Sequence, residues 1–201
     1  MSINVCNDRS MASITSLPSG VTGSSLVLLS EQTASSSSTI DFTSNIDSTY
    51  DSYIFKYINI HGSAATSNFV FQTSTNGGSS YGTTLTSTFF QASHDEADSA
   101  TGLSYQTSQD HAQATSFQKV GNFVGGNNDD NVCGMLQLFN PSSTTFVKHF
   151  TCKFVLNNHD SYCVNPFVAG YFNTTSAINA VQFKMDSGNI DAGDICLYGI
   201  L

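Results

Sequence analysis

The chain has 201 residues, with 6 Lys plus Arg against 15 Asp plus Glu, so its formal net charge is −9. That length fits one domain with or without a short tail, and six scattered basic residues argue against a fold that neutralises nucleic-acid phosphates or an anionic membrane surface. Ser and Thr together number 52 and Asn 17, a composition typical of strands and turns rather than of helices.

The hydropathy pattern predicts no membrane-spanning segment, because no run approaches the roughly 18 apolar residues that a spanning helix needs. Residues 1–18 lack a basic stretch followed by an apolar one. They therefore do not read as a secretory signal, and we expect synthesis in the cytoplasm. The five cysteines include no C-x-x-C pair. We expect reduced thiols that pack as small apolar groups, with no metal site and no cofactor.

The first 24 residues differ from the rest of the chain, because Pro18, Gly20 and Gly23 interrupt them. We interpret residues 1–24 as an extended arm for attachment and assembly, joined to a domain at 25–201. The candidate anchors of this arm are its large aliphatic side chains, Ile3, Val5, Met11, Ile14 and Leu17.

Strand patterns follow the arm, first at residues 24–32, 39–43 and 50–60. In the third, the period of two places an aromatic set on one face and a mainly aliphatic set on the other. The aromatic set is Tyr53, Phe55 and Tyr57, and the other set is Ile54, Lys56, Ile58 and Ile60. Apolar groups on both faces predict a central strand.

Two tight turns predict hairpins. Thr75-Asn76-Gly77-Gly78 contains an Asn-Gly pair, which supplies the positive φ angles of a tight turn, and would join a strand at 68–73 to a partner at 81–90. Asp186-Ser187-Gly188-Asn189 would join a strand at 181–185 to a partner at 194–201. In the strand at 181–185, residues 181, 183 and 185 are expected to face inward.

The middle of the chain predicts further strands, at residues 117–124, 132–139, 145–156 and 167–172. Asn140-Pro141-Ser142-Ser143 is a turn signal between the second and third of them. In the third, one face is expected to carry Phe146, Phe150, Cys152, Phe154 and Leu156. Residues 94–116 are polar and predict a long connection between strands.

The total is nine to eleven strands without a helix. Short strands at regular spacing with turn signals predict an antiparallel sandwich or barrel. Long connections favour a sandwich of the jelly-roll type, and the absence of a fixed-period repeat argues against a propeller. We therefore predict an all-β, antiparallel β-sandwich of jelly-roll type with a short extended N-terminal arm.

Motifs of enzymes are weak in this sequence. Gly78-Ser79-Ser80-Tyr81-Gly82 matches G-x-S-x-G, but a nucleophile elbow needs a strand followed by a helix, and strands flank this copy. The acidic residues around Asp95, Asp98 and Asp129 match no metal-binding loop, and the five histidines show no metal-site spacing. We predict that the chain is not an enzyme. Tyr and Asn in loops leave binding of a glycan open.

Three stretches carry a resemblance to a known family. They are Leu26 to Tyr57 (LVLLSEQTASSSSTIDFTSNIDSTYDSYIFKY), Leu138 to His149 (LFNPSSTTFVKH) and Gly170 to Leu201 (GYFNTTSAINAVQFKMDSGNIDAGDICLYGIL). With these stretches, residues 17–201 resemble a family of virion structural proteins from tailed bacteriophages, particularly marine and cyanobacterial ones. Residues 40–57 and the closing residues 197–200 are the most specific parts.

This resemblance implies a non-enzymatic virion component with a β-sandwich domain. Members of the family are placed as head decorations, fibres and tail proteins. We expect a capsid decoration (cement) protein, located in the virion and homo-oligomeric, with other virion proteins such as the major capsid protein as partners. The alternative is a tail-fibre or tail-associated receptor-binding subunit that recognises a host surface glycan.

Overall fold

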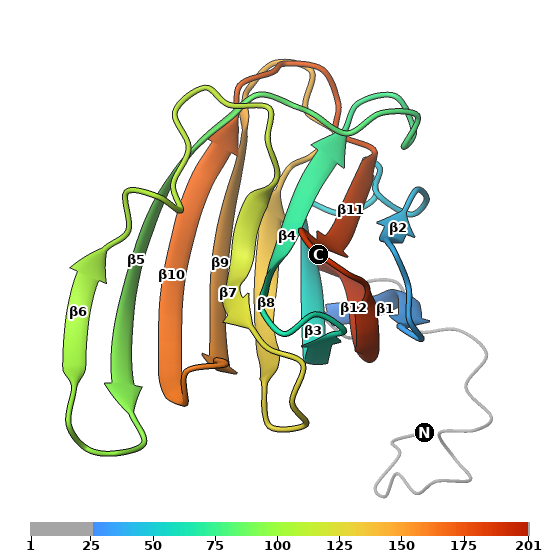
Figure 1. Ribbon diagram of the computed structural model, residues 1–201. Helices are drawn as coiled ribbons and strands as arrows, with labels where there is room; N and C mark the ends of the chain where they lie inside the picture. Colours follow the sequence, from blue (N-terminus) through green and yellow to red (C-terminus); the bar gives the residue numbers. More distant parts are fainter. Residues whose placement is uncertain (1–25, 201) are drawn as a thin grey trace, which may run out of the picture.

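The computed structural model describes residues 26–200, and within that range every regular element is a β-strand (Figure 1). The twelve strands are β1 (Leu26–Thr33), β2 (Ile40–Phe42), β3 (Ser52–Gly62), β4 (Ser67–Ser74), β5 (Leu85–Asp95), β6 (Thr101–Tyr105), β7 (Gln118–Val124), β8 (Asn131–Phe139), β9 (Lys148–Asn157), β10 (Tyr162–Phe172), β11 (Ala180–Met185) and β12 (Ile190–Ile200). The prediction of an all-β domain is confirmed.

The strands form two antiparallel sheets. The larger sheet has eight strands in the order β1-β12-β3-β8-β9-β10-β5-β6, and the smaller has four in the order β2-β11-β4-β7. Figure 1 shows β5 and β6 extending to the left beyond the smaller sheet. The larger sheet therefore has an inner face, part of which the smaller sheet covers, and an outer face on its other side.

The core between the two sheets is aromatic. Phe183 on β11 lies at its centre, with its ring 5.3 Å from that of Phe55 on β3 and 5.6 Å from that of Phe69 on β4. Phe71 on β4 contacts Phe150 on β9 at 5.3 Å between ring centroids. Rings from both sheets thus interlock in edge-to-face and stacked pairs, which add to the apolar burial that holds a sandwich together.

Two glycines make room for the largest rings of the inner face. Gly134 on β8 pairs with Phe154 on β9, and a Cβ at Gly134 would lie 2.5 Å from the Cβ of that phenylalanine. Gly170 on β10 pairs with Phe150, whose ring would lie 2.8 Å from an added Cβ. Because both positions lack a side chain, the two phenylalanine side chains of β9 can pack against the backbones of the neighbouring strands.

Both predicted hairpins are wrong in their pairing. β4 pairs with β11 and β7 in the smaller sheet, whereas β5 pairs with β10 and β6 in the larger one. Likewise β11 belongs to the smaller sheet and β12 to the larger. The turns exist, with positive φ at Gly77, Gly78 and Gly188. Each turn carries the chain from one sheet to the other, because turn chemistry fixes the reversal of the chain but not the partner of the next strand.

Three details of the middle region also differ from prediction. The polar segment 94–116 contains a strand, β6, which forms a true hairpin with β5. Ile60 is buried rather than on the face opposite Tyr57, because Asn59 has a positive φ of 52° and shifts the alternation. Phe146 lies before β9 and its side chain is 70% exposed, so it does not share the buried face of Phe150.

Lys148, the first residue of β9, is unexpectedly buried. Its Nζ donates a hydrogen bond to the carbonyl of Thr174 at 3.2 Å, and no carboxylate within residues 26–200 forms an ion pair with it. Burial lowers the pKa of this amine, because the charged form loses its hydration. A cation is thus held inside the fold at the end of the sheet where β10 also ends.

The four cysteines of the described range are free thiols, and they differ in burial. Cys152 and Cys196 are buried, Cys133 is partly buried and Cys163 is exposed. Within residues 26–200, no helix is long and apolar enough to cross a membrane.

Candidate binding surface

The five predicted anchors of the arm, Ile3, Val5, Met11, Ile14 and Leu17, lie outside the residues that the structure describes. The described residues begin with Leu26, at the start of β1, an edge strand of the larger sheet, where Leu26 pairs with Ile200.

The G-x-S-x-G segment lies in the connection from β4 to β5, between the two sheets. The Ser80 hydroxyl accepts a hydrogen bond from the Asn76 amide at 2.9 Å, and the Ser80 amide N–H donates to the Asn76 side chain at 3.1 Å. These contacts stabilise the turn. Both hydrogen bonds link Ser80 to Asn76 rather than to a histidine, so they do not form the geometry of an activated nucleophile.

In the two acidic segments around Asp95 and Asp129, the carboxylates of Asp95 and Asp130 serve as turn caps. The Asp95 carboxylate accepts bonds from the Ser99 hydroxyl at 2.5 Å and from the amides of Ser99 and Ala100 at 2.9 and 2.8 Å. These bonds, that of the Ser99 hydroxyl first, lower the pKa of Asp95. Asp130 accepts from the Asn127 amide in the same manner at 3.2 Å. Among residues 26–200 no group of three or more potential metal ligands is close enough to hold an ion.

The histidines do not gather either, and each lies in a different surrounding. The contacts are His61 with Asp191, His94 with Asp98, His111 with the carbonyl of Phe117, His149 with the ring of Tyr171, and His159 with Asp160. A polar cavity of about 560 Å³ lies beside the segment 80–84 and is lined mainly by hydroxyl and amide groups. Its lining residues include Thr75, Ser80, Tyr81, Thr115 and Asn173.

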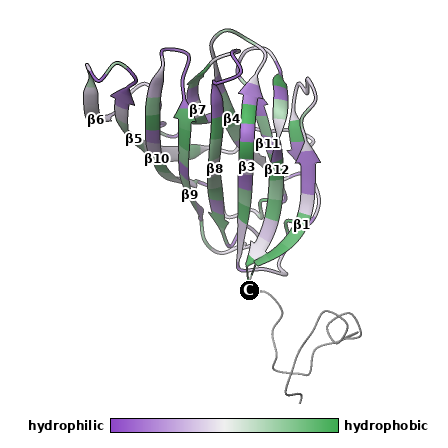
Figure 2. Cartoon of the chain, turned by 90° about the horizontal axis from the view of Figure 1, so that it is seen from below, coloured by the Kyte–Doolittle hydropathy of each residue, from purple (hydrophilic) through white to green (hydrophobic). Residues whose placement is uncertain are grey.

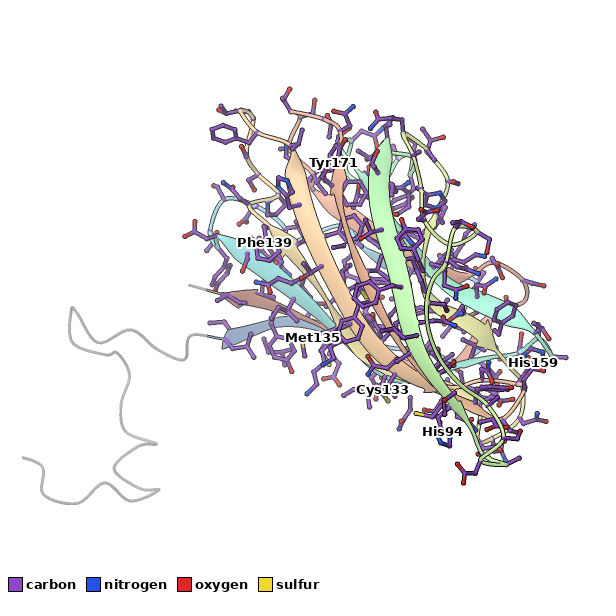
Figure 3. All side chains as sticks on the ribbon, turned by 90° about the vertical axis from the view of Figure 1, so that its left-hand side faces the viewer. His94, Cys133, Met135, Phe139, His159 and Tyr171 are labelled. Atoms are coloured by element: carbon purple, nitrogen blue, oxygen red, sulfur yellow. The ribbon has the colours of Figure 1, made fainter. Side chains whose placement is uncertain are left out.

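The largest unexplained feature is the outer face of the larger sheet. Side chains alternate between the two faces of a strand, so the residues next to each core residue along a strand point to the outer face. Several are large and apolar yet exposed, among them Phe90 at 43%, Met135 at 48% and Val155 at 44%. Figure 3 labels five residues that the alternation assigns to this face, His94, Cys133, Met135, Phe139 and Tyr171.

A single row of paired residues crosses this outer face. Registers between neighbouring strands link one residue of each strand to the next, from β3 to β6. We call it the central row, and its members in spatial order are Lys56, Met135, Lys153, Phe167, Phe90 and Tyr105. Toward the opposite edge the row continues to Cys196 on β12 and Glu31 on β1.

The aromatic rings of the central row stand on edge. Phe90 and Phe167 are stacked with 5.1 Å between centroids and 9° between planes. The Lys153 ammonium lies 5.2 Å from the centroid of the Phe167 ring. Because β9 and β5 flank β10 on opposite sides, the two faces of the Phe167 ring are occupied by a cation and by another ring. An apolar hollow of about 320 Å³ lies beside these rings and Met135.

The strands of the outer face are also poor in acidic side chains, although two acidic loop residues lie beside them. Asp110 accepts a hydrogen bond from the Tyr105 hydroxyl at 2.6 Å, and Glu96 lies near Cys133 and Cys163. The six adjacent strands β3, β8, β9, β10, β5 and β6 contain one acidic residue, Asp95. Its carboxylate is engaged by Ser99 and Ala100. The charged residues that the central row presents on these strands are Lys56 and Lys153. On a chain of net charge −9, this face is the locally basic and apolar part.

Sequence reasoning missed this surface. The alternation that marks it was visible in the long strand at 50–60, where Lys56 was assigned to the second face. The row itself depends on the order of strands that are distant in sequence, for which the chain offers no local signal. Comparisons of the chain with protein-family models, with curated proteins and with solved structures found no match.

Proposed function

We propose that the sandwich is a jelly roll enlarged by two inserted hairpins, β5–β6 and β9–β10. Without them, eight strands remain, and along the chain they alternate between the two sheets except at β4 and β7, which are neighbours in the smaller sheet. If these eight strands are renumbered from one to eight in chain order, the larger sheet has the order 1-8-3-6 and the smaller 2-7-4-5. This is the arrangement of an eight-stranded jelly roll. Both insertions extend the larger sheet on the same side of β8, so they create most of the outer face.

We further propose that the protein is a non-enzymatic structural component of a tailed-phage virion, and specifically a capsid decoration protein. The observation that carries the assembly role is the outer face, rich in Phe, Met and Tyr and poor in Asp and Glu. That composition is typical of the buried centre of protein–protein interfaces. The placement in a virion is supported by the sequence resemblance of residues 17–201 to phage structural proteins.

A decoration role fits one small domain with an attachment arm and without a long repetitive shaft. In this proposal the arm, residues 1–24, binds another virion protein, such as the major capsid protein, and becomes ordered as it binds. Repetition of the subunit over a symmetric particle would supply avidity from weak individual contacts. Synthesis takes place in the host cytoplasm, where particles assemble.

Gold labelling of intact particles with an antibody to residues 25–201, viewed by electron microscopy, tests this proposal. Label spread over the head is the expected result. Absence of label from particles would contradict a virion protein of any kind. A second measurement concerns the arm. Deletion of residues 1–24 should leave a folded domain that no longer binds to particles, and retained binding would show that another surface makes the attachment.

The alternative role is a tail-fibre or receptor-binding subunit that recognises a host glycan. The polar cavity beside Tyr81 and Asn173 favours it, because hydroxyl and amide groups suit the hydrogen bonds of a sugar. Label confined to the tail, together with saturable binding on a glycan array, would support this alternative. Asn173→Ala should then weaken the glycan binding, while Thr145→Ala, in the loop between β8 and β9, should not.

A further inference from the structure

The apolar residues of the outer face need an explanation of their own, because they are not part of the core between the two sheets. Its exposed Phe90, Met135 and Val155 lie across the sheet from the core residues and contribute little to burial in a single copy. A contiguous apolar face of this kind on a soluble domain marks a site of association. The remaining question is which kind of partner it fits.

The ring orientation argues against a sugar on this face. A sugar ring binds to the open face of an aromatic ring. Here the faces of Phe167 are taken by Phe90 and by the Lys153 ammonium, and only ring edges point outward. Ring edges standing on a sheet instead resemble the side-chain surface that packs against a second sheet, at about 10 Å between the two backbones.

The charge distribution indicates a second copy of this chain. Two molecules that each carry a net charge of −9 repel each other. The repulsion is smallest where neither surface contributes acidic groups. Strands β3, β8, β9, β10, β5 and β6 come nearest to such a surface, since Asp95 is their one acidic residue and it is bonded within its own turn. The acidic groups that neighbouring loops add are Asp110, which accepts a hydrogen bond from the Tyr105 hydroxyl, and Glu96, near Cys163.

The size of the surface agrees with a dimer. Strands β8, β9, β10 and β5 are spaced by about 4.8 Å and run for about ten residues at about 3.4 Å each. They present roughly 650 Å² per copy, or about 1,300 Å² in total for two copies. That area falls within the range of about 1,200–2,000 Å² of specific protein–protein interfaces.

We propose that the outer faces of two copies pack against each other around a two-fold axis that runs along β10. Rotation about β10 reverses the central row, so Lys153 of one copy faces Phe90 of the other, and Met135 faces Tyr105. A rotation about the row itself would instead place Lys153 against Lys153. The axis along β10 thus avoids a repulsive contact between two ammonium groups. A twisted sheet turned over about one of its strands keeps its twist, so the two faces nest.

This arrangement has a specific consequence for two native cysteines. Cys163 lies on β10, on the same face as Phe167 and four residues from it. The axis therefore brings Cys163 of one copy opposite Cys163 of the other. Cys133 lies on β8, two strands from the axis, so its two copies are about 19 Å apart across four strand spacings.

Cross-linking with a short bis-maleimide tests the axis. The protein carries Cys6→Ser throughout, so that the arm does not react. The expected result is a covalent dimer that is lost in Cys163→Ser and kept in the matched variant Cys133→Ser. Cross-linking that depends on Cys133 rather than Cys163 would overturn the proposed axis.

Sedimentation velocity tests the surface itself. The full-length protein should sediment as a dimer, and Met135→Glu should raise the dimer Kd about 100-fold or more by burying two carboxylates at the interface. Phe146→Glu is the matched control, because Phe146 is a more exposed aromatic residue in a loop outside this face. It should leave the Kd unchanged. Val155→Glu, also on the outer face, provides a second variant should Met135→Glu fail to fold.

Two results would overturn the proposal. One is a wild-type protein that remains monomeric at its highest soluble concentration. The other is a dimer that persists in folded Met135→Glu and Val155→Glu, since the interface would then lie elsewhere. Neither result bears on the location of gold label on particles, so failure of the dimer and failure of the virion proposal are distinguishable.

Discussion

The inner and outer faces of the eight-stranded sheet are built from alternate residues of the same strands, yet their side chains differ in burial and in what they pack against. On β9 the inner residues Phe150 and Phe154 are buried, with glycines placed opposite them, whereas the outer residues Lys153 and Val155 reach solvent. Figure 2 shows hydrophobic and hydrophilic residues alternating along these strands. The inner face is specified by the smaller sheet that packs on it. The outer face carries large apolar groups that the fold does not require, which indicates a second constraint on the sequence.

Truncation of one apolar side chain on each face would measure this difference most directly. Phe150→Ala should lower the free energy of unfolding by about 3–5 kcal/mol, because it leaves a cavity between Phe71 and Phe172. Val155→Ala, five residues along the same strand, should change it by less than about 1 kcal/mol. Urea denaturation of both variants makes the comparison. Equal losses would show that the outer face also stabilises the monomer.

Thiol chemistry should separate the faces next. Burial raises the pKa of Cys152 to about 12, and its sulfur lies 2.8 Å from the Tyr57 hydroxyl inside the core. Cys163 on the outer face is exposed. Because only an accessible thiolate reacts, Cys163 should react with a monofunctional maleimide at least about 100-fold faster than Cys152. Mass spectrometry of peptides after timed quenching measures both rates, on dilute protein so that association does not protect Cys163.

The buried cation of the inner face predicts a smaller and pH-dependent effect. The pKa of Lys148 is lowered by burial in the folded state and lies near 10.4 in the unfolded chain. Between these two values the unfolded state binds more protons, so the free energy of unfolding should rise as pH increases through that window. Lys148→Met should abolish the rise and increase stability at pH 7 by about 1 kcal/mol.

Urea denaturation of the wild type and of Lys148→Met at pH 7 and pH 10 provides the measurement. Lys119→Met is a suitable control, since Lys119 is also a lysine on a strand but is not buried. If the free energy of unfolding depends on pH in the same way in all three proteins, burial of Lys148 costs no stability.

The smallest effect is expected at the hairpin that widens the outer face. Hydrogen bonds from Ser99 and Ala100 lower the pKa of Asp95 below its unfolded value of about 3.9. Their stabilisation is fully present above about pH 4 and is lost as pH falls through the lower, folded pKa. Amide hydrogen exchange in β6, corrected for intrinsic rates, should therefore accelerate in acid while exchange in β9 does not. Asp95→Asn should remove this pH dependence.

Local patterns in the sequence predicted much of the fold. Alternation identified the faces of β3 as far as Ile58 and those of β11, where Val181, Phe183 and Met185 are buried as expected. What failed was the pairing across the turns at Asn76-Gly77 and Ser187-Gly188. A tight turn has the same chemistry whether the next strand pairs with the last one or crosses to the opposite sheet, and only long-range packing decides between the two.

The candidate surface was harder to predict for the same reason. Residues of the central row, such as Met135 and Phe90, are unremarkable in their own segments. They become neighbours through β9 and β10, which the chain adds between β8 and β11. The strand β6 was missed because its five residues are all exposed and carry no inward-facing apolar pattern. Likewise, the residues next to Lys148 in the sequence do not indicate that it is buried.

The pairing of β1 with β12 has a mechanical consequence. β1 is held to β12 by seven paired positions, from Leu26 with Ile200 to Thr33 with Asp194. If the arm anchors the protein to a particle, tension on that anchor enters the fold at Leu26. Tension directed along β1 would strain all these pairs at once, in shear, instead of opening them one after another. β1 would then resist a sudden force until all of its pairs with β12 break together.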